Sequence, residues 1–288
     1  LDSLNKKDFS EVALTYAKDA PNKPEAFWDA YRIDSLSQKD KATYRVVDSI
    51  GERLKLDKIV EVGTEIGNGY IPWGKFNIPI NRFFGYNKHE GFRLGAGLET
   101  NKKLFKNIVF GGYLAYGYRD NDWKYGVKIR FDIDPTKDMF LQLNYQNDMR
   151  EIGTASMNRS SGFSLNGDLR SFIASHMDFV ESFELKFGRR DLKYLTWSAS
   201  LKNENIKPQY DYFFIENQNL ISNYSNTQAE FKLRYAHRER IVETPLKRVS
   251  LGTNYPVFNA IYTQGFDNLL GGDFSYQKIE ASVHQSST

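Results

Sequence analysis

The stretch that decides the fold is Gly91–Asp134, which contains GFRLGAGLET (91–100), IVFGGYLAYGYR (108–119) and WKYGVKIRFDI (123–133). In the last run, apolar and polar side chains alternate without a break. A period of two predicts a β-strand with one apolar and one polar face. The run is longer than the roughly 5–6 residues of an ordinary strand. It matches the roughly 9–11 tilted residues that cross a bilayer. The stretch therefore predicts a transmembrane β-barrel.

The composition is compatible with a protein that crosses a membrane with strands. The chain has 288 residues, no cysteine and a formal net charge of +3, from 39 basic and 36 acidic side chains. This balance argues against nucleic acid as a partner, and the lack of cysteine excludes thiol metal sites. No run of about 18 apolar residues occurs, so the sequence predicts no transmembrane helix. Barrel strands, by contrast, hide their apolar face in alternation.

The pattern divides the chain into two parts, residues 1–56 and residues 57–288. The first part is polar and then predicts a short amphipathic helix that begins at Ser37. The sequence Ser37-Gln38-Lys39-Asp40 is similar to a capping box, and apolar residues follow at helical spacing up to Leu54. We expect this part to be a linker and a helical periplasmic segment, and residues 57–288 to be an outer-membrane β-barrel.

The second part predicts an all-β, antiparallel transmembrane β-barrel of which about ten strands are seen. The predicted strands are Ile59–Tyr70, Gly91–Thr100, Ile108–Arg119, Trp123–Ile133, 139–148, Phe179–Gly188, Leu192–Asn203, 228–235, Arg248–Gly265 and Phe274–His284. Pro256 predicts a bend in the ninth strand, and a change of parity predicts a bulge in the tenth. The longest connections, 72–90, 150–177 and 204–224, fall on one side, which is typical of extracellular loops.

Two groups of side chains are candidates for function. Charged residues of both signs recur on the predicted lumen-facing side, and we interpret them as a cross-strand salt-bridge lattice or, alternatively, as the selectivity surface of a pore. They are Arg93, Glu99, Lys124, Lys128, Arg130, Glu184, Lys186, Glu230, Lys232 and Arg234. The candidates for the membrane interface are Trp73, Trp123, Tyr125 and Trp197. Gly95 and Gly97 also face the predicted lumen, where glycines mark a bend or the close approach of an inserted loop.

The motifs do not support catalysis, a cofactor or a metal. His89-Glu90 lacks the second histidine of a zinc-binding helix. Gly95-Ala96-Gly97 lacks the third glycine and the following helix of a dinucleotide fingerprint. Asp120 and Asp122 fit the acidic pair of a rim protease only loosely, because a solvated turn explains them as well. We expect no enzyme, with a rim-site outer-membrane hydrolase as a distant alternative.

Several blocks of sequence resemble one family in the same order. They are Phe27-Trp28, Tyr86-Asn87, Glu90–Gly95, Thr100-Asn101, Gly112–Asp120, Trp123–Gly126, Tyr255-Pro256, Tyr262–Gly265 and Ser275–Ile279. The family is the large outer-membrane proteins of Bacteroidota with an N-terminal carboxypeptidase-regulatory-like domain and a C-terminal barrel of unknown function. The resemblance implies a β-sandwich domain upstream and further barrel strands downstream. The family name does not imply peptidase activity.

These observations predict a non-enzymatic integral protein of the cell outer membrane that acts as a scaffold, assembly or transport-complex component. The first alternative is a passive or gated channel for a small solute. The expected partners are the lipid bilayer with its lipopolysaccharide and other envelope proteins. A soluble β-sandwich is disfavoured, because the strands are long and their apolar faces are rich in aromatic residues.

Overall fold

The structure is a computed structural model, and it describes residues 12–15, 23–24, 27–28, 30–31, 37–40, 42–43, 62–63, 65–67, 69–152, 176–191, 194–210, 214–216, 219–243, 248–250 and 252–285. Its strands are β1 (Val12–Thr15), β2 (Tyr70–Trp73), β3 (Phe76–Pro79), β4 (Phe84–Asn87), β5 (Gly91–Thr100), β6 (Ile108–Gly117), β7 (Asp122–Asp134), β8 (Met139–Glu151), β9 (Met177–Asp191), β10 (Leu195–Pro208), β11 (Phe214–Glu216), β12 (Asn219–Ile221), β13 (Tyr224–Ala236), β14 (Ile241–Glu243), β15 (Arg248–Ser250), β16 (Val257–Phe266) and β17 (Tyr276–His284). The 3-10 helices are η3 (Ile80–Arg82) and η4 (Pro135–Lys137).

The chain forms two compact units. The first comprises Leu1–Thr64 and Glu239–Gly252, and the second comprises Glu65–Arg238 and Thr253–Thr288. The sheet of the first unit has the order β1-β14-β15, with β1 parallel to β14 and β14 antiparallel to β15. In the described parts of the chain, no helix combines the length and the apolar character needed to span a membrane.

The first unit contains the predicted capping box. The Asp40 backbone N–H donates to the Ser37 Oγ over 3.2 Å, and the Ser37 N–H donates to the Asp40 carboxylate over 3.1 Å. This reciprocal pair satisfies N–H groups that a helix start leaves free. The hydroxyl and the N–H of Ser37 also hold the pKa of Asp40 below its usual value. The predicted helix start is therefore confirmed, while residues 44–54 of that prediction lie outside the described residues.

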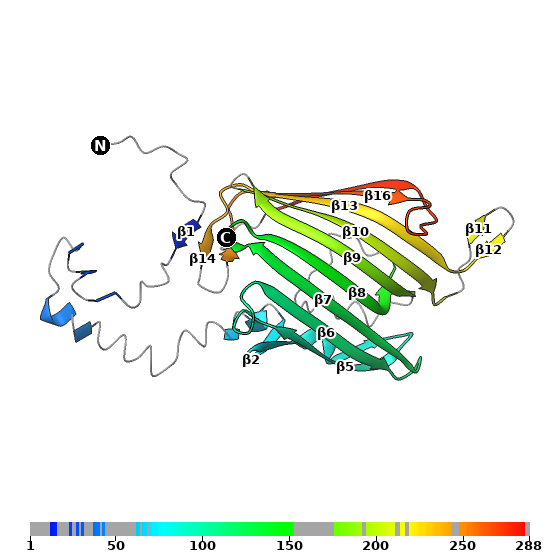
Figure 1. The fold of residues 1–288 in the computed structure, drawn as a ribbon, viewed down its shortest axis with the longest axis horizontal. Coiled ribbons are helices and arrows are strands. Elements are labelled where there is room, and N and C mark those ends of the chain that lie inside the picture. The colour runs from blue at the N-terminus through cyan, green and yellow to red at the C-terminus, as the bar shows by residue number, and fades with distance from the viewer. Residues whose placement is uncertain are drawn as a thin grey trace. The chain divides into compact units, whose positions relative to one another are not determined.

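The second unit is built on one twelve-stranded sheet (Figure 1). Its order is β17-β16-β13-β10-β9-β8-β7-β6-β5-β3-β2, with β4 pairing with β5 beside this path. Every pairing in it is antiparallel. Strands β5 to β9 each pair with the strand before and after them in sequence, as hairpins do. The predicted all-β antiparallel architecture is confirmed.

The described residues do not close this sheet into a barrel. Strands β17 and β2 end the order, and no pairing joins them within the described residues. The N-terminal edge consists of short strands, since β3 pairs with β5 at only two positions and β4 at four. A closed barrel was predicted, but the described residues form an open, curved antiparallel sheet.

Several predicted boundaries are wrong. Residues 62–63 and 65–67 are helical, so the predicted strand Ile59–Tyr70 does not form, and β2 begins only at Tyr70. A short apolar run that contains several glycines does not distinguish a strand from a helical turn. The predicted connection 72–90 contains the whole of β3, η3 and β4. The ninth predicted strand splits at its predicted bend, and its two parts, β15 and β16, belong to different sheets.

The predicted bulge in the tenth strand is also wrong. The ladder between β16 and β17 runs without a shift from Gly265 opposite Tyr276 to Val257 opposite His284. Tyr276 instead lies on the polar face, where its hydroxyl donates to the Gln228 side chain over 2.5 Å. An aromatic side chain with a polar end can satisfy its hydroxyl on a polar face. Because Tyr276 was counted as an apolar-face residue, the sequence pattern of the tenth strand appeared to change faces, although the pairing of β16 with β17 does not shift.

The two faces of the sheet have opposite chemistry. An apolar row crosses seven strands in register on one face: Phe131, Leu141, Phe187, Ala199, Phe231, Tyr262 and Ile279. A polar row crosses neighbouring positions on the other face: Lys128, Asn144, Glu184, Lys202 and Gln228. The apolar face is solvent-exposed, with Leu185, at its centre, 38 % exposed. The described residues that are buried, by contrast, are more often polar than apolar.

Candidate functional site

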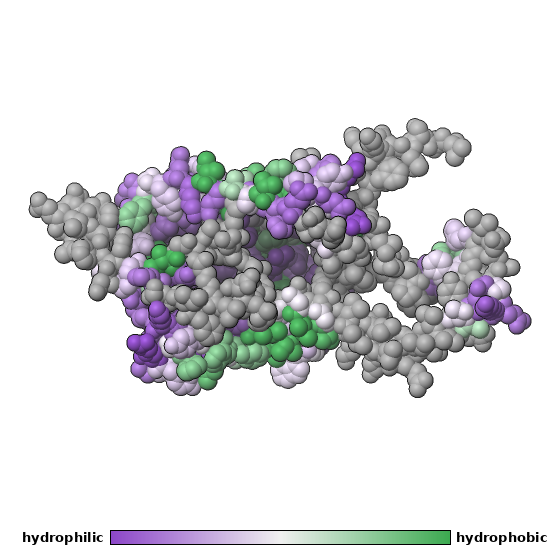
Figure 2. Space-filling view, turned by 180° about the vertical axis from the view of Figure 1, so that it is seen from behind, coloured by the Kyte–Doolittle hydropathy of each residue, from purple (hydrophilic) through white to green (hydrophobic). Residues whose placement is uncertain are grey.

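The polar face encloses a cavity of about 1050 Å³. Its lining includes residues of every strand along the sheet order from β2 to β17. Since both edge strands reach the same cavity, the sheet must curl around it. Figure 2 shows hydrophilic residues around a hollow and hydrophobic residues gathered in a band below it. The polar side of the sheet is therefore the concave side, and the apolar side is convex.

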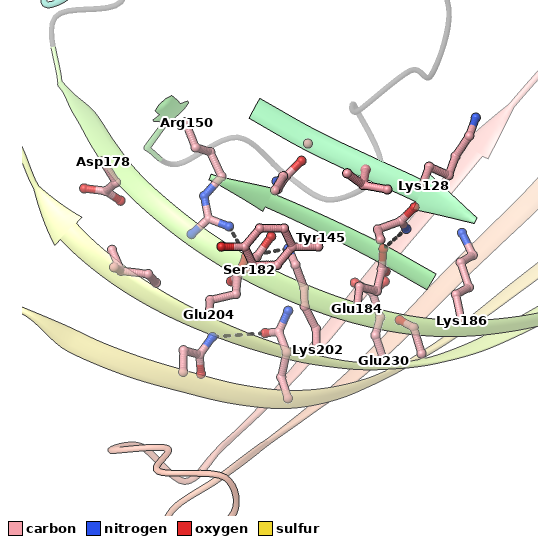
Figure 3. Close-up of a pocket in the computed structure, with 18 of the residues that line it drawn as sticks. Lys128, Tyr145, Arg150, Asp178, Ser182, Glu184, Lys186, Lys202, Glu204 and Glu230 are labelled. Carbon is pink, nitrogen blue, oxygen red and sulfur yellow. Dashed lines mark hydrogen bonds and ion pairs between the residues drawn. The ribbon is translucent and has the colours of Figure 1, made fainter. Parts of the chain in front are cut away.

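The cavity wall carries as many basic as acidic side chains (Figure 3). The basic ones are Arg82, Lys128, Arg150, Lys186, Lys202, Lys232 and Lys278. The acidic ones are Glu99, Glu151, Asp178, Glu184, Glu204, Glu230 and Glu280. A wall without net charge produces no strong field for one sign of ion.

Most of these charges form cross-strand or same-strand ion pairs. Lys128 on β7 contacts Glu99 on β5 over 2.7 Å, and the Tyr70 hydroxyl donates to the same carboxylate over 3.3 Å. Glu204 on β10 accepts from Lys202 over 2.5 Å and from Arg150 on β8. On the cavity wall, the contacts of Lys128 with Glu99 and of Arg150 with Glu204 each join two strands that are separated by one other strand. Ion pairs between strands are the contacts that a cross-strand salt-bridge lattice requires.

Further pairs of this kind lie along single strands. Arg130 contacts Asp132 over 2.7 Å, and its guanidinium lies 3.8 Å from the centre of the Phe140 ring. Lys232 contacts Glu230 over 3.0 Å. Arg234 follows on the same face of β13, where it is half-buried.

Lys186 and Glu184 on β9 differ from this pattern. No carboxylate lies within ion-pair distance of the Lys186 ammonium among the described residues. Glu184 accepts a hydrogen bond from the Asn144 amide over 2.8 Å, and no described cation lies within ion-pair distance of it. Both side chains line the cavity. Within the predicted lumen-facing set, these two side chains line the cavity without a described ion-pair partner, so their charges can interact with a solute.

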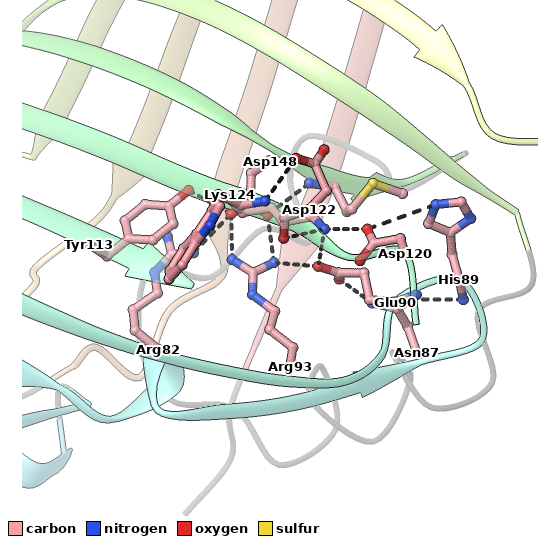
Figure 4. Close-up of polar contacts among 12 residues, drawn as sticks. Arg82, Asn87, His89, Glu90, Arg93, Tyr113, Asp120, Asp122, Lys124 and Asp148 are labelled. Carbon is pink, nitrogen blue, oxygen red and sulfur yellow. Dashed lines mark hydrogen bonds and ion pairs between the residues drawn. The ribbon is translucent and has the colours of Figure 1, made fainter. Parts of the chain in front are cut away.

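Several polar contacts meet at Asp148 on β8 (Figure 4). Arg93 on β5 binds this carboxylate with both guanidinium ends, over 2.5 and 2.9 Å. The Tyr113 hydroxyl on β6 donates to it over 2.5 Å, and Arg82 on η3 approaches within 3.4 Å. Asp148 is 7 % exposed. A buried carboxylate is stable in such a place only because these donors replace water.

A second buried cluster lies beside it and contains Lys124, which is fully buried. Its ammonium contacts Asp120 and lies 3.4 Å from Glu90, and it donates to the Asp122 backbone carbonyl over 3.2 Å. Glu90 also accepts from the Asn87 amide over 2.5 Å. These contacts connect the turn before β5 to the turn before β7. The loosely predicted acidic rim pair, Asp120 and Asp122, thus contributes to this structural cluster.

The aromatic candidates lie at the two ends of the convex face. Trp123 and Tyr125 lie near the start of β7, where the Tyr116 and Trp123 ring centres are 5.0 Å apart. Trp197 lies at the opposite end, near the start of β10. Trp73 is 66 % exposed and ends β2 beside the turn that leads to β3. Each end of the convex face therefore carries at least one of the predicted interface residues.

Gly95 and Gly97 allow part of the chain to lie against the concave face. A Cβ added at Gly95 would lie 2.6 Å from the Arg82 carbonyl oxygen, and one at Gly97 would lie 2.6 Å from the Pro79 ring. The element that approaches them is residues 78–83, which we call the inward segment. The predicted close approach of an inserted element is confirmed.

Alanine at Gly95 is expected to destabilise the protein by about 1–3 kcal/mol, because backbone atoms on two sides would have to move. Alanine at Gly85 is the control, since the nearest atom to its added Cβ is 3.8 Å away. We expect less than about 0.5 kcal/mol there. Urea unfolding followed by tryptophan fluorescence measures both. Equal effects of the two substitutions would contradict the packing described above.

The sequence analysis missed Arg82, Tyr113 and Asp148. Arg82 lies in a region predicted to be a connection, so no face could be assigned to it. Tyr113 and Asp148 occupy polar-face positions of strands whose alternation was recognised. The available signal was a large tyrosine side chain between Gly111 and Ala115 on the polar face of β6. Among the described residues, no group of three His, Asp or Glu side chains is arranged to hold a metal ion.

Comparison with known protein families gives one match. Residues 178–288 contain a DUF5686 C-terminal domain, a family of unknown function. This domain begins at the second residue of β9 and extends past β17, so it includes one half of the cavity wall. Neither a curated protein nor a solved structure matches the chain.

Proposed function

We propose that the chain is part of an integral outer-membrane β-barrel that acts, without catalysis, as a scaffold, assembly or transport-complex component. The observation that supports this proposal is the distribution of side chains in the large sheet. Its apolar side chains point outward into solvent, and its charged side chains point inward to a shared cavity. A water-soluble sheet buries its apolar face. The opposite arrangement is typical of a barrel whose outer surface contacts lipid.

The dimensions of the apolar band support the same proposal. Trp123 and Ile133 are ten residue steps apart on β7, which is about 33 Å along a strand. A tilt of roughly 40° reduces this to about 25 Å across the membrane, the usual height of the lipid-facing band. Aliphatic residues occupy the middle of the band, and aromatic residues gather toward its ends, where membrane interfaces favour them. Closure of the sheet into a barrel, by strands pairing at the β17 and β2 edges, is part of this proposal.

The wall of the cavity favours a scaffold over a selective pore. Most of its charges are neutralised by neighbours, and the signs balance. The alternative, a passive or gated channel for a small solute, is supported by the cavity itself. The outer-membrane location, the bilayer with its lipopolysaccharide and other envelope proteins as partners are parts of the proposal that rest on the sequence resemblance described above.

Fractionation of envelopes tests the proposal. We expect the full-length protein to sediment with outer membranes, to resist extraction by carbonate and to require detergent for purification. A folded barrel should also migrate faster than its boiled form on a semi-native gel. A protein that stays monomeric and folded in buffer without detergent would refute the membrane proposal. Planar-bilayer recordings then distinguish the alternatives, because a closed scaffold gives no current steps and a channel does.

A further inference from the structure

The inward segment begins at the end of β3, where Ile78 and Pro79 still pair with β2, and its later residues reach the cavity. Residues 78–83 stand opposite only residues 95–98 of β5, between the pairs Asn77–Glu99 and Phe84–Leu94. These six residues face only four residues of β5, so they cannot pair with β5 as a regular strand. Pro79, Asn81 and Arg82 line the cavity instead. The segment therefore occupies space that a plain edge strand would leave open.

Two glycines on β5 allow this segment to lie close to the concave face of the sheet. At Gly95 and Gly97, the Arg82 carbonyl and the Pro79 ring occupy the space where side chains would project. The Phe83 carbonyl accepts a hydrogen bond from the Gly95 N–H over 3.0 Å. The segment thus rests on the concave face with one backbone hydrogen bond to β5 at this point, and its Ile80 N–H also donates to the Gly69 carbonyl over 2.9 Å.

Arg82 holds the far side of the segment through a contact that can be released. Its guanidinium lies 3.7 Å from the centre of the Tyr113 ring and 3.4 Å from Asp148. Its side chain is 33 % exposed, whereas that of Arg93 is 16 % exposed and binds Asp148 twice. If Arg82 moves away, Asp148 keeps Arg93 and Tyr113 as partners. Release of Arg82 therefore leaves no buried charge unpaired, which would otherwise oppose the motion.

We propose that the inward segment is a movable constriction of the cavity, held in its closed position by the contact of Arg82 with Tyr113 and Asp148. This inference rests on the proposed barrel, because it assigns the segment to the lumen. Loss of the Arg82 contact shifts the balance toward an open position. The loss of one partly exposed ion pair and one cation–π contact changes the ratio of open to closed by about tenfold.

Arg82→Gln tests the constriction, with Arg130→Gln as a matched control. Arg130 also faces the cavity side, pairs with a carboxylate and lies 3.8 Å from the centre of an aromatic ring, but it belongs to β7 itself. The chain has no cysteine, so nitroxide labels can be placed at Asn81→Cys and at Asp267→Cys, in the turn after β16. We expect one distance in the parent protein, a second, longer distance in Arg82→Gln, and no change in Arg130→Gln.

Gly97→Ala provides a second, independent variant, because its added Cβ displaces Pro79 whatever Arg82 does. It should populate the same longer distance, and semi-native gels confirm that each variant is folded. An unchanged distance in both folded variants would overturn the constriction. A protein that needs no detergent would overturn the proposed barrel instead, while the label distances would still report on the segment.

Discussion

Arginine in place of Leu185 is expected to destabilise the proposed membrane-inserted barrel by about 2–4 kcal/mol, because it places a charge at the middle of the band that we propose to face lipid. Leu185 lies on the convex face and is flanked in register by Leu143 on β8 and Leu201 on β10. Refolding into phospholipid vesicles at increasing urea concentrations measures the free energy of unfolding. The tryptophans of the band provide the fluorescence signal.

Val283→Arg is the matched control for this experiment. Val283 points to the same convex face and is 64 % exposed, but it lies one residue from the end of β17. Near an interface the same charge costs only about 0–1 kcal/mol. In a water-soluble sheet both exposed positions would accept arginine with little change. Equal and small effects at the two positions would therefore contradict a lipid-facing surface.

Asparagine in place of Asp148 is expected to lower the free energy of unfolding by about 3–5 kcal/mol, because it removes the carboxylate that binds the buried Arg93 at hydrogen-bond distance. The substitution preserves the size of the side chain, so a packing defect does not explain such a loss. Arg93 also lies 3.6 Å from Glu90, which is too far for a good hydrogen bond. The same urea titration in vesicles measures the effect.

Asp138→Asn is the control for the removal of a carboxylate. Asp138 contacts Arg190 over 2.9 Å, but its side chain is 34 % exposed, so water can replace it. Its backbone has a φ of +48°, which asparagine adopts readily. We expect a loss below about 1 kcal/mol. A loss at Asp148 no larger than that at Asp138 would mean that the buried cluster does not stabilise the sheet as described.

The strand pattern could be predicted from the sequence because it is local. In β7 the alternation of apolar and polar residues from Trp123 to Ile133 assigns each residue to one face of the sheet, and the structure places β7 at Asp122–Asp134. The glycines of β5 were informative for the same reason, since a gap on a polar face implies that something fills it. Tyr276 shows the limit of this approach, because a phenol can belong to either face.

The contacts of the inward segment could not be predicted from the sequence. Arg82 reaches Asp148 across 66 positions of sequence and Arg93 reaches it across 55. No periodicity in either region predicts that these arginines contact Asp148, because the contact depends on the curvature of the sheet. Helical turns at 62–63 and 65–67 were missed because short apolar runs with glycine fit several conformations. Closure of a sheet into a barrel likewise depends on strand number and stagger, which alternation does not contain.

The buried cluster at Asp148 also has a consequence for the order in which the molecule forms. Strands β5 to β8 pair with their sequence neighbours and are joined by short connections, so these hairpins can assemble one after another. The carboxylate of Asp148 acquires its arginines only after four strands, β5 to β8, have come into register. A slipped strand would place an uncompensated charge at that point. The cluster therefore makes the correct register of β5 to β8 more stable than a slipped one.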